Sequence, residues 1–207
     1  MAITTYSELQ SAIADFLNRD DLTSVIPTFV SLAEADISRR LRHWRMDKRA
    51  SLTLDDQYVD LPADWLETIS FTVAATDGPR EIEFASRPDM DDLRWKTGDT
   101  PGVPAQYAIS GGQLELRPTP SETFTGTLTY VGKADALSVS NTSNWILSNF
   151  PDIYLYSALI HSAPYLGEDA RIQVWAALYQ AAVDAANTES EEAKYSGSGL
   201  RMKVRAY

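Results

Sequence analysis

The chain has 207 residues, of which 44% are hydrophobic and 23% are charged, and this composition is typical of a water-soluble globular protein. It contains no cysteine, which excludes disulfides, thiolate metal ligands and cysteine nucleophiles. No run of about 18 apolar residues occurs, and the first residues do not combine a basic segment with an apolar run. We therefore expect neither a membrane span nor a signal peptide.

The net charge of -11 is distributed unevenly along the chain. Residues 39–49 carry six bases and one acid, for +5, and residues 194–207 carry four bases, for +4. The remaining residues therefore hold a charge of -20. Because so negative a field repels phosphate, we do not expect the whole protein to bind nucleic acid tightly, and any basic partner surface must be local.

Two helices are predicted near the start of the chain. Thr5 and Glu8 have the spacing of a capping box, and apolar residues then recur at helical intervals, which predicts a first helix over about residues 5–18. Ser24 is expected to cap a second helix with Pro27 in its first turn. The apolar face of this second helix is expected to comprise Ile26, Phe29, Val30, Ala33, Ile37, Leu41 and Trp44.

From residue 50 the pattern changes to the alternation that is typical of antiparallel strands. Short segments rich in β-branched and aromatic residues are separated by turn signals. Gly111 and Gly112 predict a hairpin, because a two-residue loop needs the positive backbone angles that glycine supplies. One short helix is expected within residues 87–98, RPDMDDLRWKTG.

Two further helices are predicted in the last third of the chain. Pro151 and Asp152 suit a first helical turn, and the helix they begin is expected to run to about Ala163, where Pro164 ends or kinks it. Residues 167–193 have a strong helical period of apolar residues and predict the most regular helix of the protein.

The predicted fold class is α+β, mainly an α-helical bundle of four helices from the two chain ends, with an inserted antiparallel β region and a flexible C-terminal tail. The N-terminal helical pair is expected over 1–49 and the β insertion with its short helix over 50–140. The C-terminal helical pair is expected over 141–193, and an extended arm over 194–207 follows it.

No catalytic, cofactor or metal role is assigned to any residue. His43 and His161 are the only histidines, and neither has a second histidine at ligand spacing. Neighbouring acids such as Asp91 and Asp92 diverge in strands and helices, so they do not form an acid and base pair. Phosphate-loop and dinucleotide-binding motifs are missing. We expect a protein without a cofactor that is not an enzyme.

The run RRLRHWRMDKR at 39–49 has two interpretations. The cations of this run could bind phosphate, and Trp44, which lies between them in the sequence, could stack on a base. Alternatively, cations favour the C-terminal end of a helix, and a basic helix end can contact acidic surfaces of other copies. The candidates for subunit contact are Arg39, Arg40, Arg42, Arg45 and Arg49.

Three segments in register resemble the head-to-tail adaptor proteins of short-tailed phages, also called connector or tail tubular proteins. Residues 144–187 resemble the family's C-terminal helical pair, and residues 29–42 are similar to its helix with an acid before an arginine cluster. Residues 58–67 and 104–138 follow the family order of strands and prolines. The resemblance covers about residues 3–190.

This resemblance implies a structural virion protein at the head-tail junction, assembled in the host cytoplasm and unconnected with membranes. Members form a ring, usually of about twelve copies, beneath the portal of a DNA-filled head. The implied partners are the portal protein, the tail nozzle or tail tube, other copies of the chain, and passing double-stranded DNA that is not bound tightly. A nucleic-acid-binding module using Arg39 to Arg49 and a virion-associated cell-wall hydrolase remain as alternatives.

The basic C-terminal segment lies where the resemblance fades. Bases and apolar residues alternate there with a period of two, which suits an extended strand in a partner's groove. By extension from the family, we expect this segment to be mobile in the free protein and to contact the portal. The candidate portal contacts are Leu200, Arg201, Met202, Lys203, Val204, Arg205 and Tyr207.

Overall fold

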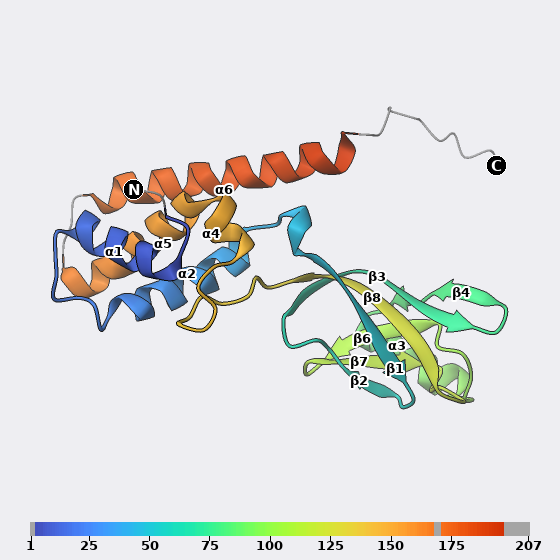
Figure 1. Cartoon of the computed structure of the whole chain (residues 1–207). Helices are drawn as coiled ribbons and strands as arrows, with labels where there is room; N and C mark the ends of the chain where they lie inside the picture. The colour runs from blue at the N-terminus through green and yellow to red at the C-terminus, as the bar shows by residue number, and fades with distance from the viewer. Residues whose placement is uncertain (1–2, 168–170, 197–207) are drawn as a thin grey trace. The chain divides into compact units, whose positions relative to one another are not determined.

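A computed structural model describes residues 3–167 and 171–196 of the chain (Figure 1), so the candidate portal contacts between Leu200 and Tyr207 lie outside the described residues. The chain forms two compact units. The helical unit combines the residues up to Trp44 with those from Ala134 onward, and the β unit consists of Arg45–Lys133. The chain therefore leaves the helical unit once and returns to it once.

The helical unit is arranged around one central helix. Helix α5 packs against α1, α2, α4 and α6, and α1 also contacts α2. Its apolar side chains lie on several faces, which is why it is buried among neighbours instead of covering one surface. The helices of this unit are α1 (Tyr6–Leu17), α2 (Ile26–Arg40), α4 (Trp145–Asn149), α5 (Pro151–Leu166) and α6 (Ile172–Tyr195).

Helix α1 begins as predicted. The Thr5 hydroxyl accepts a hydrogen bond from the Glu8 backbone N–H at 3.3 Å, and the Glu8 carboxylate accepts one from the Thr5 N–H at 3.0 Å. This capping box satisfies two of the N–H groups that a helix start leaves without an intrahelical partner.

Helix α2 differs from its prediction at both ends. Val25 occupies the N-cap position and no side chain caps the helix, so the predicted role of Ser24 is wrong. The backbone turns extended at Leu41, which ends the helix at Arg40. Trp44 therefore does not continue the apolar face, but lies in the short 3-10 turn η1 (Trp44–Met46) with 41% of its surface exposed.

Helix α5 continues through Pro164 to Leu166, so of the two predicted outcomes, an end at about Ala163 or a kink at Pro164, the end is wrong. The proline falls in the last turn, where the missing N–H interrupts little of the remaining helix. Helix α6 was predicted, whereas the five-residue α4 just before α5 was not. The amide oxygen of Asn144 caps α4 by accepting the Leu147 N–H at 2.9 Å.

The β unit consists of two four-stranded sheets, in the orders β1-β8-β3-β4 and β2-β7-β6-β5. The pairs are antiparallel as predicted, except that β5 runs parallel to β6. The strands are β1 (Asp47–Leu54), β2 (Tyr58–Asp60), β3 (Trp65–Ala75), β4 (Gly78–Glu81), β5 (Glu83–Phe84), β6 (Gln106–Ser110), β7 (Gln113–Arg117) and β8 (Phe124–Gly132).

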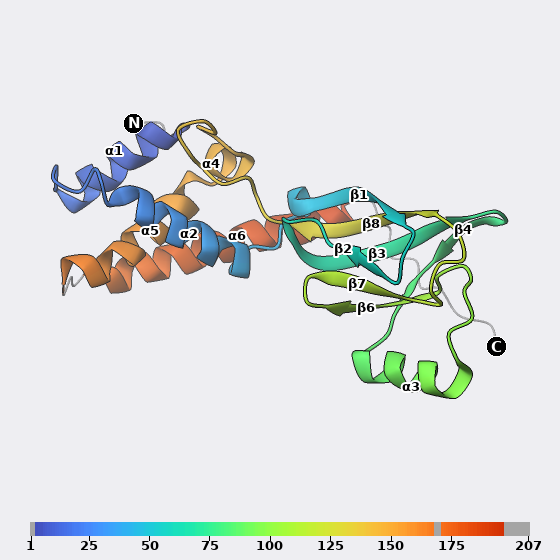
Figure 2. The same ribbon diagram turned by 90° about the horizontal axis from the view of Figure 1, so that it is seen from below.

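The core of the β unit lies between these two sheets, which face each other in Figure 2. It includes Phe71 of β3, Leu54 of β1 and Tyr107 of β6, all buried. The close fit requires glycine at Gly126, where a Cβ would stand 2.9 Å from the Phe71 ring. Helix α3 (Arg87–Thr97) packs on β6 outside the sandwich.

Two local predictions in this unit are confirmed. Gly111 and Gly112 both have positive φ, at 61° and 86°, and connect β6 to β7 as a hairpin. Helix α3 is capped by the hydroxyl of Ser86, which accepts the Asp89 N–H, and Gly98 with positive φ follows its last residue.

The α+β class is confirmed by six helices and two sheets within the described ranges. The expectation of a mainly helical bundle is not confirmed, because 45% of the described residues are helical and 26% are in strands. The β region has an apolar core of its own and forms a second compact unit of the chain in addition to the helical one.

Candidate interaction surfaces

The arginine run begins at the end of α2, where two of its members pair with one carboxylate. Arg39 and Arg40 donate to the Asp36 carboxylate at 3.1 and 3.2 Å, and Asp36 is only 8% exposed. Burial of Asp36 opposes its ionisation, but the hydrogen bonds and charges of Arg39 and Arg40 help to hold its pKa below the ordinary value. These two arginines therefore have a structural role inside the helical unit.

The other arginines of the run lie on different segments. Arg42, in the connection after α2, donates through Nη1 to the carbonyl oxygens of Ser38 at 2.9 Å and Leu41 at 2.8 Å, which caps the end of the helix. Arg45 lies in η1 and Arg49 in β1, both exposed and both in the β unit. The run is therefore spread over a helix end, a connection, a 3-10 turn and a strand.

Two side chains of α6 bind the connection that leaves the helical unit, and we call Asn187 and Ser190 the α6 tie. The Arg42 N–H donates to Oδ1 of Asn187 at 2.8 Å, and the Trp44 N–H donates to the Ser190 hydroxyl at 2.8 Å. Asn187 also donates to the Arg40 carbonyl oxygen at 3.3 Å. Sequence reasoning missed this tie, although Ser190 falls one turn after Ala186 on the buried face of α6.

A second set of hydrogen bonds holds the connection that returns from the β unit, and we call it the Glu34 tie. Oε1 of Glu34 accepts the Leu137 N–H at 2.7 Å and the Tyr154 hydroxyl at 3.3 Å. Asn144 donates to the Tyr154 oxygen at 2.7 Å and to the Asp135 carbonyl at 2.8 Å. Burial raises the pKa of both Glu34 and Tyr154 above their ordinary values.

The histidines lie in packed surroundings within the helical unit. The His43 side chain is 1% exposed, and its ring lies 5.1 Å from the Trp145 ring and 5.6 Å from the Phe150 ring, measured between centroids. Burial lowers the pKa of His161 in α5. Among residues 3–167 and 171–196, no group of three or more His, Cys, Asp or Glu side chains could hold a metal ion.

One polar cluster joins the first and last strands of the β unit. Lys48 donates to Asp64 at 2.7 Å and to the Lys133 carbonyl at 3.1 Å, while the Tyr130 hydroxyl donates to Asp64 at 2.9 Å. Burial, with the neighbouring Asp64 carboxylate, raises the pKa of Tyr130 to about 12. A Cβ at Gly132 would stand 2.8 Å from the Lys48 side chain and 2.9 Å from the Asp64 carboxylate, so a larger residue there would have to displace this cluster.

Helix α3 is fixed to the second sheet by buried polar contacts. The Arg94 guanidinium pairs with Glu115, which is 2% exposed, and Arg117 donates to the Leu93 carbonyl at 3.0 Å. On the same helix Trp95 is 90% exposed. A helix held so firmly presents this tryptophan to solvent as a candidate anchor for a protein partner.

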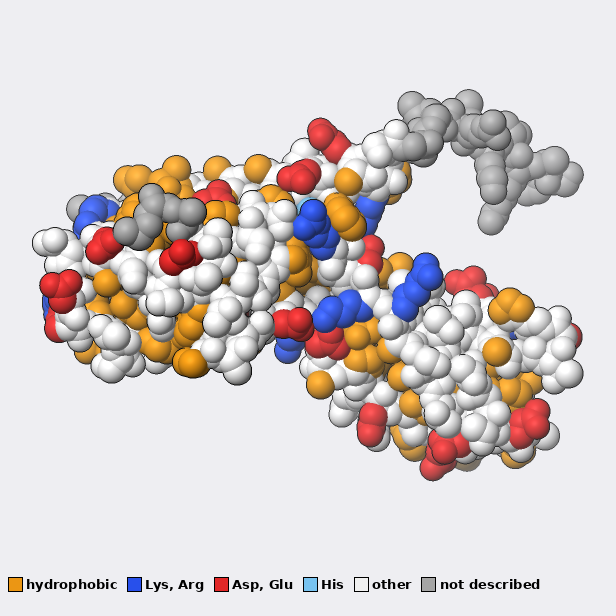
Figure 3. Space-filling model, viewed as in Figure 1, with side chains coloured by type: hydrophobic (Ala, Val, Ile, Leu, Met, Phe, Trp, Pro, Cys, Tyr) orange, Lys and Arg blue, Asp and Glu red, His pale blue; other side chains and the backbone are white. Residues whose placement is uncertain are grey.

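Part of the exposed surface of α6 is apolar. Its inner face packs through Trp175, Tyr179 and Val183, whereas Val174 and Leu178 are 58% and 42% exposed. Figure 3 shows a row of hydrophobic side chains along this helix. Three alanines continue the exposed face at helical spacing, at positions Ala177, Ala181 and Ala185.

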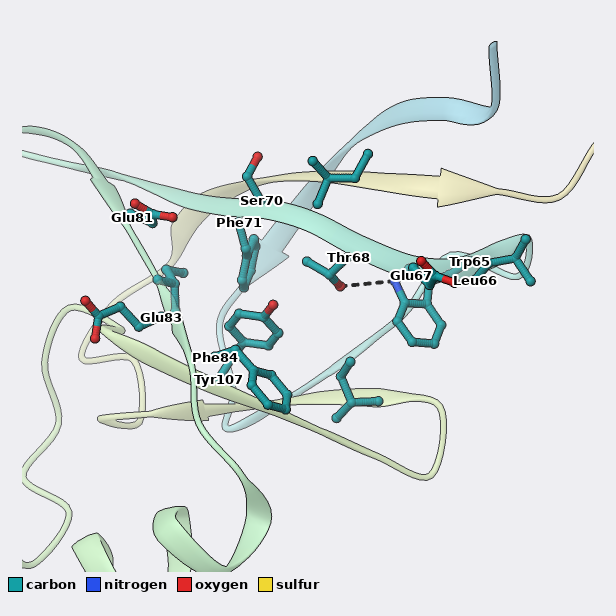
Figure 4. A pocket seen from close by; sticks show the side chains of 13 residues that line it. Trp65, Leu66, Glu67, Thr68, Ser70, Phe71, Glu81, Glu83, Phe84 and Tyr107 are labelled. Atoms are coloured by element: carbon teal, nitrogen blue, oxygen red, sulfur yellow. Dashed lines mark hydrogen bonds between the residues drawn. The ribbon is translucent and has the colours of Figure 1, made fainter. Parts of the chain in front are cut away.

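An open cleft of about 610 Å³ lies in the β unit (Figure 4). One wall is the continuous stretch 65–71 of β3, and the other is the segment 81–84 that crosses from the first sheet to the second. Tyr107 and Phe84 reach into it from β6 and β5. This cleft could not be predicted from the sequence, because its walls come from strands that pair in different sheets.

The described residues thus combine two hydrogen-bonded connections, exposed apolar side chains and a cleft between strands, which are features of a structural protein that contacts other proteins. The family model described as SU10 adaptor protein matches residues 4–203. The chain belongs to this family and is a phage structural adaptor protein, a virion component that functions in tail assembly with the phage portal and tail proteins.

A search of curated proteins found no match to the chain. The match to this family model confirms the resemblance to phage head-tail adaptors that the sequence segments indicated. Within the described ranges, no helix is long and apolar enough to cross a membrane.

Proposed function

We propose that this protein assembles as a ring on the portal and joins the DNA-filled head to the tail nozzle or tail tube. The observation that carries this proposal is the family match, which extends over residues 4–203 and therefore includes both units. The ring would comprise about twelve copies, and each copy would contribute to the channel through which DNA leaves.

The exposed apolar residues of α6 support contact between copies. Val174 and Leu178 give it apolar surface, and the alanines beside them allow close approach of a neighbouring helix. We propose Arg45 and Arg49 as further subunit contacts, together with Arg39, whose side chain stays 65% exposed although it pairs with Asp36. Acidic residues on a neighbour can pair with them, and the end of α6 exposes Glu189, Glu191 and Glu192.

The charge of the chain suits a DNA conduit. Each copy carries -11, so a ring of about twelve copies is strongly acidic, and residues facing the channel repel passing DNA. Two of the arginines, Arg39 and Arg40, already pair with Asp36, which reduces what the run offers to phosphate.

Electron microscopy with the portal protein of the same phage tests the proposal. We expect the isolated protein to be a monomer or a weak oligomer, and a mixture with assembled portal to show an additional ring on one face of the portal. A mixture that leaves the portal bare at micromolar concentrations of both proteins would contradict the proposed function. The same particles, incubated with the tail nozzle protein, should bind it only when the ring is present.

A further inference from the structure

The cleft in the β unit has an open strand edge as one of its walls. Strand β3 pairs with β8 along most of its length, but its pairing with β4 covers only residues 72–75. In the described part of the chain, residues 66–70 therefore have a neighbouring strand on one side only. Open strand edges accept an additional strand, because their backbone N–H and C=O groups can continue the sheet.

The cleft has a mixed lining, in which apolar side chains alternate with polar and acidic ones. Phe71 and Ile82 line it as buried core residues, and Ile69 and Phe84 are 50% and 63% exposed at its margins. A volume of about 610 Å³ lies within the range of about 300–1,000 Å³ that is usual for ligand clefts. The cleft therefore has room for an extended segment, and Ile69 and Phe84 offer exposed apolar surface to its side chains.

The margins of the cleft are acidic. Glu67, Glu81 and Glu83 are all exposed and all belong to its walls, and no base is among its lining residues. An extended segment that fits this surface needs apolar side chains on one face and cations on the other. Successive side chains of a strand point to opposite faces, so such a segment has alternating apolar and basic residues.

The chain itself contains a segment with this pattern, outside the described residues. At 200–205 the sequence reads Leu-Arg-Met-Lys-Val-Arg, with three apolar residues alternating with three bases. We propose that residues 200–205 of a second copy add a strand to β3 at 66–70, with the apolar side chains in the cleft and the bases beside the three glutamates. This links neighbouring copies in the ring, and it rests on the proposed function for the presence of those neighbours.

The resemblance to phage adaptors instead assigned the same segment to the portal, so the two assignments can be separated by experiment. The chain has no cysteine, which makes engineered disulfides specific. A tagged Ile69→Cys variant is mixed with untagged Val204→Cys and, separately, Met202→Cys under mild oxidation. A disulfide needs the two Cα atoms within about 7 Å of each other. Two partner positions are used because the register in which the added strand pairs with β3 is not fixed in advance.

We expect a heterodimer band from Ile69→Cys with at least one partner, well above that from Val139→Cys. Val139 is a matched control, because it is 90% exposed and lies in the helical unit. If Ile69→Cys gives no more heterodimer than Val139→Cys, both with Val204→Cys and with Met202→Cys, the proposal is overturned.

Charge reversal provides the second test. With Glu67→Lys, Glu81→Lys and Glu83→Lys added to Ile69→Cys, we expect about tenfold less heterodimer, since three exposed charge pairs become repulsive. The matched control reverses three exposed acids of the same unit outside the cleft, Asp55, Asp91 and Glu122, and should leave the yield unchanged. If both triple variants lower the heterodimer yield equally, the change in net charge and not the cleft lowers the yield, which contradicts the proposal.

A labelled peptide of residues 198–207, SGLRMKVRAY, separates recognition of the segment from ring formation. It should bind the full-length protein saturably, and a scrambled peptide of the same composition should not. Portal-bound rings without the crosslink would refute this inference and leave the proposed function standing. Crosslink and peptide binding without any ring on the portal would refute the proposed function alone.

Discussion

The backbone N–H of Trp44 donates a hydrogen bond at 2.8 Å to the hydroxyl of Ser190, which lies 146 residues later in the chain. Together with Asn187, this serine holds the connection that leaves the helical unit against α6. On the return, Glu34 of α2 accepts the N–H of Leu137 at 2.7 Å. The helical unit therefore fixes both of its connections to the β unit through side chains of α2 and α6.

Ser190→Ala should loosen the first connection without unfolding the helix. The substitution removes the acceptor of the Trp44 N–H, which should cost about 1 kcal/mol of stability and speed hydrogen exchange at the Trp44 amide. Asn187→Ala should do the same at the Arg42 amide. Glu191→Ala, at an exposed position of the same helix, is the control. Unchanged exchange at Trp44 in the Ser190 variant would show that the tie does not hold the connection.

Asp36→Asn should destabilise the helical unit in a manner that depends on pH. The pKa of Asp36 is lowered in the folded protein, so its contribution is present above the ordinary value of 3.8 and is lost as pH falls through the folded pKa. We expect a loss of about 1–3 kcal/mol at pH 7, because hydrogen bonds to a charged group are broken. Urea unfolding, followed by helical circular dichroism, should show this difference shrinking in acid. A difference that stays constant from neutral to strongly acidic pH would contradict the pairing.

Glu34→Gln should show the opposite dependence on pH. Burial raises the pKa of Glu34 above 4.5, so as pH rises the unfolded chain loses its proton before the folded one does, and the wild type loses stability across that interval. Glutamine keeps an acceptor for Leu137 and has no charge to bury. The stability of the variant relative to wild type should therefore increase from acidic to neutral pH. The two variants are controls for each other, since both residues lie on α2.

Gly126→Ala should destabilise the β unit by about 1–3 kcal/mol, the usual cost of overpacking a core. A new Cβ would stand 2.9 Å from the Phe71 ring and 3.0 Å from Leu54, so one of them must move. Gly102→Ala is the matched control, because its Cβ would meet Pro118 at an ordinary 3.5 Å. Thermal unfolding that is equal in both variants would show that the core can relax around the methyl group.

The isolated protein should show no appreciable affinity for duplex DNA at physiological salt. The chain carries -11, and the pairing of Arg39 and Arg40 with Asp36 reduces what the arginine run can offer to phosphate. Replacement of Arg39, Arg42 and Arg45 by alanine should therefore change nothing in an anisotropy titration. Sub-micromolar binding that weakens steeply with salt and is lost in the triple variant would favour the nucleic-acid-binding alternative.

The sequence by itself determined those elements whose signals are local. The capping box at Thr5, the glycine pair of the hairpin and the helical period of α6 depend on residues a few positions apart, and all three appear where they were predicted. The α+β class followed from the change of periodicity near residue 50.

Only the tertiary structure decided the contacts between distant segments. Ser190 is an ordinary helical serine until the connection at Trp44 lies beside it, and Glu34 is an ordinary surface acid until Leu137 and Tyr154 bury it. The cleft likewise arises because β4 leaves β3 and the chain crosses to the other sheet. Local periodicity cannot determine such features, since their energy comes from groups that meet only after the chain has folded.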